Sequence, residues 1–173
     1  MFPEVNAVLK FILDHPTTKT HLREIARQTS YSPAGARKAL QHLVKRGLVT
    51  ETPGTAVTTY AANTASPVWL PLKRTTNLFA LYASGLVDTL VEQYEEPRAM
   101  VLFGSFARGD DTEKSYNEIG IVTQHEHEPD LRKIEAKIGH KINIITFQPD
   151  TAEKEFLNNI ANGIVLHGYL KIL

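Results

Sequence analysis

Apolar side chains recur every three or four residues through the first third of the chain, which is the spacing of one helix face. This pattern predicts a first helix over about residues 5–13, a second over Leu22–Gln28, and a third that starts at Ser32-Pro33 and stops at Gly47. Serine caps the free amides of a helix start, and proline suits the first helical position because its missing N–H would be unpaired there.

β-type patterns follow the third predicted helix. Residues 48–62 contain two short β-type runs around Pro53-Gly54-Thr55, so they are predicted to form a hairpin. Residues 63–75 are rich in turn-forming residues and are expected to be an interdomain linker, with Trp69 packed into a core. Helical spacing then resumes over about residues 77–94, where one broad apolar face is also suited to pairing two subunits.

The last third of the chain alternates between strand and helix patterns. Strands are expected at 99–103, 118–122 and 141–147, with a short final strand at 164–167. Helices are expected at about 130–138 and 150–162. The sequence therefore predicts an α+β protein with an N-terminal domain at 1–62, a linker and connecting helix at 63–95, and a C-terminal α/β domain with a small mixed sheet at 96–173.

Composition narrows the possible functions. The chain has no cysteine, which excludes disulfides, thiol catalysis and cysteine-ligated zinc. The first residues lack the features of a secretory leader, and no apolar run is long enough to span a membrane. A cytoplasmic protein without a membrane partner is therefore expected.

Charge is divided unequally along the chain, although the formal net charge is zero. Residues 1–62 carry eight Lys or Arg and four Asp or Glu, a net charge of +4, and the remainder carries −4. A basic front and an acidic back are typical of a protein that faces nucleic acid, although an ordinary solvated surface has the same composition.

Three helices followed by a hairpin is the order of a winged helix. The stretch HLREIARQTSYSPAGARKALQHLVKRGLV resembles the winged helix-turn-helix of prokaryotic transcription regulators over nearly its whole length. In such folds the third helix enters the major groove and the wing holds the DNA backbone. The resemblance implies a DNA-binding set of Ser32, Ala34, Arg37, Lys38, Gln41, Lys45, Arg46 and Thr55.

The members of this set suit different contacts. Arg37 and Gln41 can present paired groups to guanine and adenine edges, whereas Lys38, Lys45 and Arg46 suit phosphates. Two alternatives stay open at this point: the residues are merely solvated, or the domain contacts another protein.

Residues 101–122, VLFGSFARGDDTEKSYNEIGIV, resemble the core motif of the minimal nucleotidyltransferases of the DNA polymerase beta superfamily. In that family a Gly-Ser turn precedes an Asp-x-Asp pair on the next strand, and a third aspartate follows on a neighbouring strand. These carboxylates hold two divalent ions that carry out phosphoryl transfer. Here the three positions fall on Tyr116, Glu118 and Asn143.

The loss of two anionic side chains changes the expected chemistry. A two-metal clamp cannot be assembled from Glu118 alone, so we expect no catalytic residue, metal or cofactor, with Mg²⁺ on Glu118 or rescue by the nearby Asp110 or Asp111 as the alternatives. Gly104, Ser105 and Arg108 are candidates for binding a nucleotide or phosphate. His125 and His127, which alternate with glutamates, are a weak metal-site candidate and fit an exposed loop better.

The combined resemblances predict a DNA-binding transcriptional regulator that carries a catalytically inactive, nucleotidyltransferase-like domain. That domain would serve ligand sensing, dimerisation or partner binding, and the expected partners are double-stranded DNA, a nucleotide ligand and a second copy of the chain. The alternative is an active metal-dependent nucleotidyltransferase, including one of antitoxin type, that its winged helix directs to a target.

Overall fold

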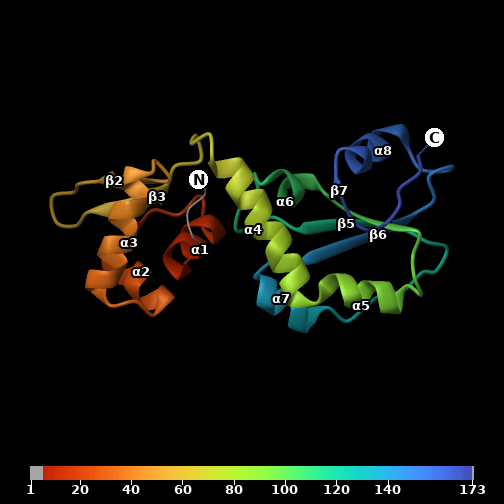
Figure 1. Cartoon of the computed structure of the whole chain (residues 1–173), viewed down its shortest axis with the longest axis horizontal. Coiled ribbons are helices and arrows are strands. Elements are labelled where there is room, and N and C mark those ends of the chain that lie inside the picture. Colours follow the sequence, from red (N-terminus) through yellow and green to blue (C-terminus); the bar gives the residue numbers. More distant parts are fainter. Residues whose placement is uncertain (1–5, 173) are drawn as a thin grey trace. The chain divides into compact units, whose positions relative to one another are not determined.

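The computed structural model describes residues 6–172, and these form an α+β protein with eight helices and two sheets (Figure 1). The chain divides into two compact units, with the boundary between Lys73 and Arg74. None of the helices in the described residues has both the length and the apolar character that crossing a membrane requires.

The N-terminal unit contains three helices and a three-stranded antiparallel sheet. Its elements are α1 (Ala7–Asp14), β1 (Thr20–His21), α2 (Leu22–Thr29), α3 (Pro33–Lys45), β2 (Val49–Thr52) and β3 (Thr59–Ala62). The three predicted helices and the hairpin are present, although residue 5 lies outside the described residues. The two-residue strand β1 was not predicted; it pairs with β3, which gives the sheet order β1-β3-β2.

Local capping and core packing explain where these helices begin. Asn6 Oδ1 accepts a hydrogen bond from the Leu9 amide at 3.0 Å, and Ser32 Oγ accepts one from the Gly35 amide at 3.1 Å. Both contacts satisfy amides that a helix start leaves unpaired. The core beneath the helices consists of apolar residues from every helix of the unit together with Trp69, which is 2% exposed as expected of a core residue.

The helical connection differs from the expected linker. Helix α4 (Trp69–Ser84) already begins inside residues 63–75. Pro71 does not prevent this, because it lies in the first turn, where a missing N–H breaks no helical bond. The predicted helix over 77–94 is also divided: α4 ends at Ser84 and α5 (Leu86–Gln93) follows. Gly85 separates them with a left-handed backbone, φ +82°.

The C-terminal unit is built on a four-stranded mixed sheet. Its remaining elements are β4 (Ala99–Phe103), α6 (Gly104–Arg108), β5 (Asn117–Val122), α7 (Arg132–Ile138), β6 (Ile142–Phe147), α8 (Lys154–Ala161) and β7 (Ile164–Gly168). The strand order is β6-β5-β4-β7, in which only β5 and β6 run parallel. The predicted strands are confirmed to within one residue at each end, and α8 begins about four residues later than expected.

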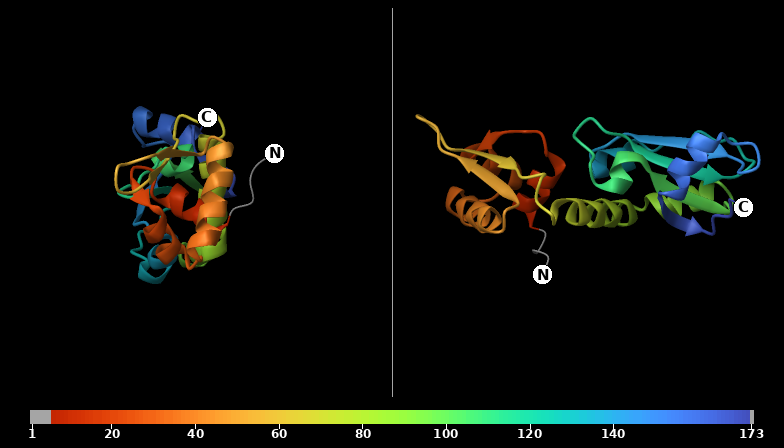
Figure 2. Two further views of the ribbon diagram at one scale, coloured as in Figure 1. Left: turned by 90° about the vertical axis from the view of Figure 1, so that its left-hand side faces the viewer. Right: turned by 90° about the horizontal axis from the view of Figure 1, so that it is seen from above.

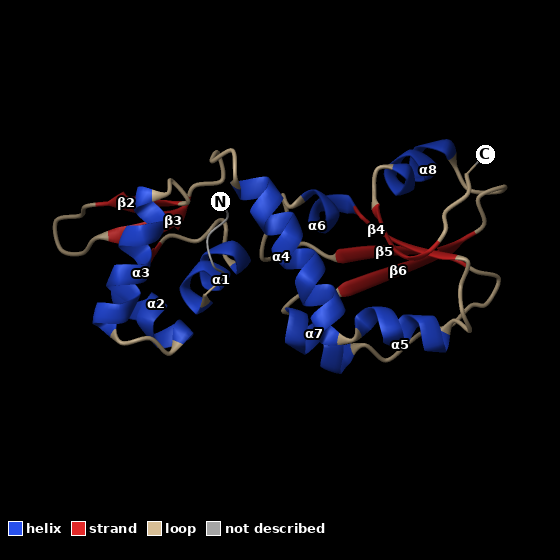
Figure 3. Ribbon diagram, in the orientation of Figure 1, coloured by secondary structure: helices blue, strands red, loops and turns tan. Residues whose placement is uncertain are grey.

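Helices cover both faces of this sheet (Figures 2 and 3). Because strand side chains alternate, Val101 and Phe103 pack towards α8 while Met100 and Leu102 pack with α5 and α7. The ring of Phe156 on α8 meets Phe103 edge-on, with centroids 5.7 Å apart. Glu118 occupies the end of β5 on the α8 face, beyond this apolar cluster.

Candidate nucleic-acid interface

The outward face of α3 carries the residues that the sequence assigns to DNA. Ala36, Leu40 and Leu43 are buried in the core of the N-terminal unit. All eight members of the predicted DNA-binding set lie exposed on α3, on its ends or on the hairpin tip: Ser32, Ala34, Arg37, Lys38, Gln41, Lys45, Arg46 and Thr55. The helix therefore exposes the polar side chains of Arg37, Lys38, Gln41 and Lys45, while its apolar face is buried.

The electrostatic surroundings of α3 are basic. Residues 30–50 contain four Lys or Arg and no Asp or Glu. Arg46 Nε donates a hydrogen bond to His42 Nε2 at 3.0 Å, which holds this guanidinium along the last turn of the helix. A phosphate near this turn would meet an oriented positive group together with Lys45.

Glu51 on β2 is the first acidic residue after α3. The hydroxyl of Tyr60 on β3 donates to Glu51 Oε1 at 2.9 Å, so the carboxylate is held against the sheet. Burial, followed by this hydrogen bond, raises the pKa of Tyr60 above its ordinary value. Tyr60 therefore remains a neutral donor at physiological pH.

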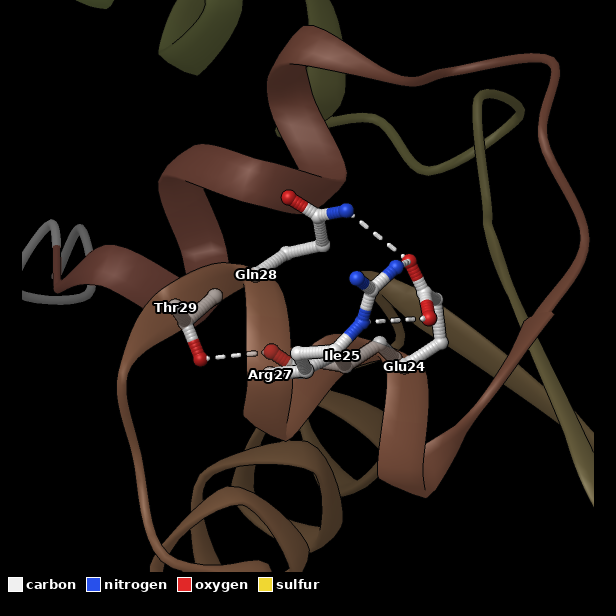
Figure 4. A network of polar contacts seen from close by, with 5 residues as sticks. All are labelled: Glu24, Ile25, Arg27, Gln28 and Thr29. Carbon is white, nitrogen blue, oxygen red and sulfur yellow. Dashed lines mark hydrogen bonds and ion pairs between the residues drawn. The ribbon is translucent and has the colours of Figure 1, made fainter.

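Helix α2 contributes less free positive charge than its sequence suggests (Figure 4). Arg27 donates two hydrogen bonds to Glu24, from Nε at 3.1 Å and from Nη2 at 2.6 Å. Gln28 Nε2 donates to the same carboxylate at 2.9 Å, and Figure 4 shows all three side chains grouped on one side of the helix. The bonds from Arg27 and then Gln28 lower the pKa of Glu24, so this group stays ionised and neutralises Arg27.

The hairpin extends the exposed surface beyond α3. Residues 53–58 connect β2 and β3, and Thr55 lies exposed at this tip beside Val57, which is 55% exposed. The register pairs Thr52 with Thr59, which leaves these six residues as a protruding loop.

The residues at the nucleotidyltransferase-like positions are only partly brought together. Glu118 on β5 and Asn143 on β6 are direct partners in the parallel register, so they lie side by side. The carboxylate of Glu118 also lies against Gly104, the first residue of α6. Tyr116 precedes β5 and is 58% exposed.

The two loop aspartates are held by other groups. Asp110 accepts a hydrogen bond from Arg108 Nε at 3.2 Å on the surface. Asp111 is 2% exposed and accepts a hydrogen bond from Asn77 Nδ2 at 2.7 Å. Within residues 6–172, no group of three or more His, Cys, Asp or Glu side chains is arranged to hold a metal ion.

The candidate phosphate site has mixed electrostatics. Gly104 and Ser105 open α6, a helix of five residues, and Arg108 at its end is paired with Asp110. The Glu118 carboxylate adds a negative group at Gly104, so an anion at this turn would meet electrostatic repulsion.

The histidine-containing loop after β5 lies exposed, with all four residues 125–128 at the surface. The Tyr94 hydroxyl donates to the backbone oxygen of His127 at 2.8 Å, and the two rings meet edge-on. The same loop and residues of β6 together line an open pocket of about 670 Å³. This pocket was not predicted: the loop and the strand were recognisable separately, but nothing in the sequence showed that they contribute to one pocket.

Comparison of the chain with protein-family models, with curated proteins and with solved structures gives no match. The functional interpretation therefore depends on the residues and contacts of the chain itself.

Proposed function

We propose that this chain is a DNA-binding transcriptional regulator whose α3 enters the major groove and whose hairpin contacts the backbone. The observation that carries this proposal is the exposed row of cationic and amide side chains on α3, on a helix whose other face is buried. Arg37 and Gln41 read base edges, and Lys38, Lys45 and Arg46 contact phosphates. The net charge of +4 on residues 1–62 supports the same assignment.

The binding test uses the full chain and fragments of the genome that encodes it. Selection of bound fragments is expected to yield one short duplex motif, and the affinity for this motif is expected to fall as salt concentration rises. Arg37→Ala or Gln41→Ala should weaken binding to the selected motif by about 1–3 kcal/mol and relax its sequence preference. Failure to recover any fragment with salt-sensitive binding would reject the proposal in favour of a protein-contact domain.

A phosphate-contact variant and a matched control make the test specific. Lys45→Ala should weaken binding to all duplexes and reduce the magnitude of the salt slope by about 1. Lys10→Ala removes the same charge from α1 in the same unit, where Lys10 pairs with Asp14, and should leave both properties unchanged. Equal effects of the two substitutions would indicate a non-specific charge effect.

For the C-terminal unit we propose a non-catalytic role in ligand sensing, dimerisation or partner binding. Its side chains support this proposal. Glu118 is the one carboxylate at the three positions that hold metal in the family, and Asp110 and Asp111 accept hydrogen bonds from Arg108 and Asn77.

Incubation of the chain with labelled nucleoside triphosphates and Mn²⁺ should give no nucleotidyl transfer. A labelled product that the unaltered chain forms and Glu118→Ala does not form would instead support the active nucleotidyltransferase. Calorimetry with ATP, GTP and cyclic nucleotides, with and without Mg²⁺, tests the ligand-sensing role.

A further inference from the structure

Strand β6 is an edge of the four-stranded sheet, and its outward backbone groups can be assigned. The Asn117 amide donates to the Lys141 oxygen at 2.8 Å, which sets the phase of pairing between β5 and β6. In a parallel pair, alternate residues direct their backbone groups to the same neighbour. Residues 143, 145 and 147 therefore face β5, and the N–H and C=O groups of Ile142, Ile144 and Thr146 point to the open edge.

One of these outward amides is already occupied. Glu135 Oε1 on α7 accepts a hydrogen bond from the Ile142 amide at 3.0 Å, while Lys141 Nζ donates to Glu135 Oε2 at 2.7 Å. No other strand pairs with β6 within residues 6–172. Ile144 and Thr146 therefore present backbone donors and acceptors at the edge, which is the arrangement that templates an added strand.

The open edge borders a surface pocket. Ile142, Ile144 and Thr146 line the pocket of about 670 Å³, and residues 126–132 line the same pocket. The hydrogen bond from Tyr94 to the His127 oxygen anchors this segment to the end of α5. An added strand would lie about 4.8 Å from β6, on the side where the strand lines this pocket.

Charge around the pocket selects the chemistry of an occupant. Asp130 pairs with Arg132, and Glu135 pairs with Lys141. Glu126 and Glu128 also line the pocket, and both are exposed without an ion pair in the described part of the chain. Self-pairing of two β6 edges would bring both copies of these glutamates together, which like-charge repulsion disfavours. A cationic segment is complementary to them.

We propose that the β6 edge binds an extended segment of a partner protein that carries Lys or Arg side chains, adding it to the sheet as a fifth strand. Backbone hydrogen bonds to Ile144 and Thr146 supply affinity, and the pocket selects cationic side chains through Glu126 and Glu128. This surface lies in the C-terminal unit and does not depend on DNA binding by α3.

The test probe is a fluorescent octapeptide of alternating lysine and valine, measured against the full chain by fluorescence anisotropy. The peptide is expected to bind, and its glutamate–valine counterpart is not. The double variant Glu126→Gln and Glu128→Gln should weaken binding by about tenfold at low salt. The double variant Glu153→Gln and Glu155→Gln, at exposed positions outside the pocket, is the matched control and should leave binding unchanged.

Amide hydrogen exchange then distinguishes strand addition from simple charge attraction. The Ile144 and Thr146 amides should become protected when the lysine–valine peptide binds, while the Ile142 amide is already protected by Glu135. Thr146→Pro removes one of the outward N–H groups that the added strand would use, and it should abolish binding. The variant is expected to fold, because proline is tolerated where an edge N–H faces away from the sheet. If that variant does not fold, the exchange measurement on the unaltered chain is decisive.

Three outcomes would overturn the proposal. These are the absence of lysine–valine binding, equal binding of the glutamate–valine peptide, and binding without added protection at Ile144 and Thr146. Protection of these amides without peptide, together with self-association of the chain, would assign the edge to a second copy instead.

Discussion

The carboxylate of Glu118 lies where any residue larger than glycine at position 104 would place its Cβ. Gly104 also has a left-handed backbone, φ +72°, so it combines a conformational requirement with a close approach. These two residues connect the end of β5 with the turn that starts α6, and their contact puts a negative charge on that turn.

Gly104→Ala should therefore cost more stability than an alanine substitution that meets only the backbone requirement. Gly139 is the matched control, because its φ is +82° and nothing lies near its added Cβ. We expect losses of about 1 kcal/mol for Gly139→Ala and about 1–2 kcal/mol for Gly104→Ala in urea unfolding followed by circular dichroism, because the Glu118 side chain must rotate away from the added methyl group. In a Glu118→Ala background the cost of Gly104→Ala should fall towards that of Gly139→Ala; an unchanged cost would show that the two residues are uncoupled.

Asn117 on β5 offers a test of buried polarity. Its side chain is fully buried, and neither its Oδ1 nor its Nδ2 has a hydrogen-bond partner among the described residues. Asn117→Leu should raise the free energy of unfolding by about 1 kcal/mol, because leucine has no polar group to desolvate.

The matched contrast to Asn117 is Asn77, which is also buried but donates to the Phe106 oxygen at 3.0 Å and to Asp111. Asn77→Leu should lower stability by about 2 kcal/mol, since it removes the two hydrogen bonds that this buried amide donates. Both changes are measured by chemical denaturation. Destabilisation of similar size by the two substitutions would contradict the assignment of Asn117 as an unpartnered amide.

The contacts of Glu135 should make a contribution to stability that depends on pH. Its bond from Lys141, followed by that from the Ile142 amide, holds the pKa of this carboxyl below its ordinary value of 4.5. A lowered pKa in the folded state means that ionised Glu135 stabilises the fold above pH 4.5, and that this contribution is lost as the pH falls through the folded-state value.

Glu135→Ala should consequently reduce stability by about 1 kcal/mol at pH 7, and the difference from the unaltered protein should shrink in acid. Thermal melts between pH 7 and pH 3 measure this difference. Glu153→Gln, at an exposed position, is the control. A deficit for Glu135→Ala that stays constant across the range would mean that the carboxylate charge has no part in the contact.

Ser32 allows the start of α3 to be tested apart from DNA. Ser32→Ala removes the acceptor for the Gly35 amide and should lower stability of the N-terminal unit by about 1 kcal/mol, whereas Ser32→Asp retains a capping oxygen. Trp69, the only tryptophan, lies in the core of this unit and reports its unfolding by fluorescence. Equal losses for the two variants would indicate that Ser32 does not act as a cap.

Local sequence signals predicted most elements because those elements carry complete patterns. The Ser32-Pro33 start of α3 and the apolar patterns of strands β4 and β6 all depend on neighbouring residues. Strand β1 was not predicted, because two residues are too few to show an alternation of apolar and polar side chains. The division at Gly85 was missed because apolar spacing continues on both sides of it.

The candidate sites were less predictable because their contacts join distant residues. The buried Asp111 accepts a hydrogen bond from Asn77, which lies 34 positions earlier in the chain. No local pattern identifies such a partner. Arg27 and Arg46 have similar sequence settings, but Glu24 neutralises the first while His42 orients the second. The pocket beside β6 could not be predicted, because residues 126–132 help to line it and their path is known only from the three-dimensional structure.

The position of β4 in the middle of its sheet has a consequence for the order of folding. All five of its residues are buried, and it pairs on one side with β5 and on the other with β7. While the chain is being synthesised, one edge of this apolar strand stays open until residues 164–168 emerge. An unpaired apolar edge of this kind favours aggregation, so we expect the docking of β7 to protect the AMVLF segment in newly made protein.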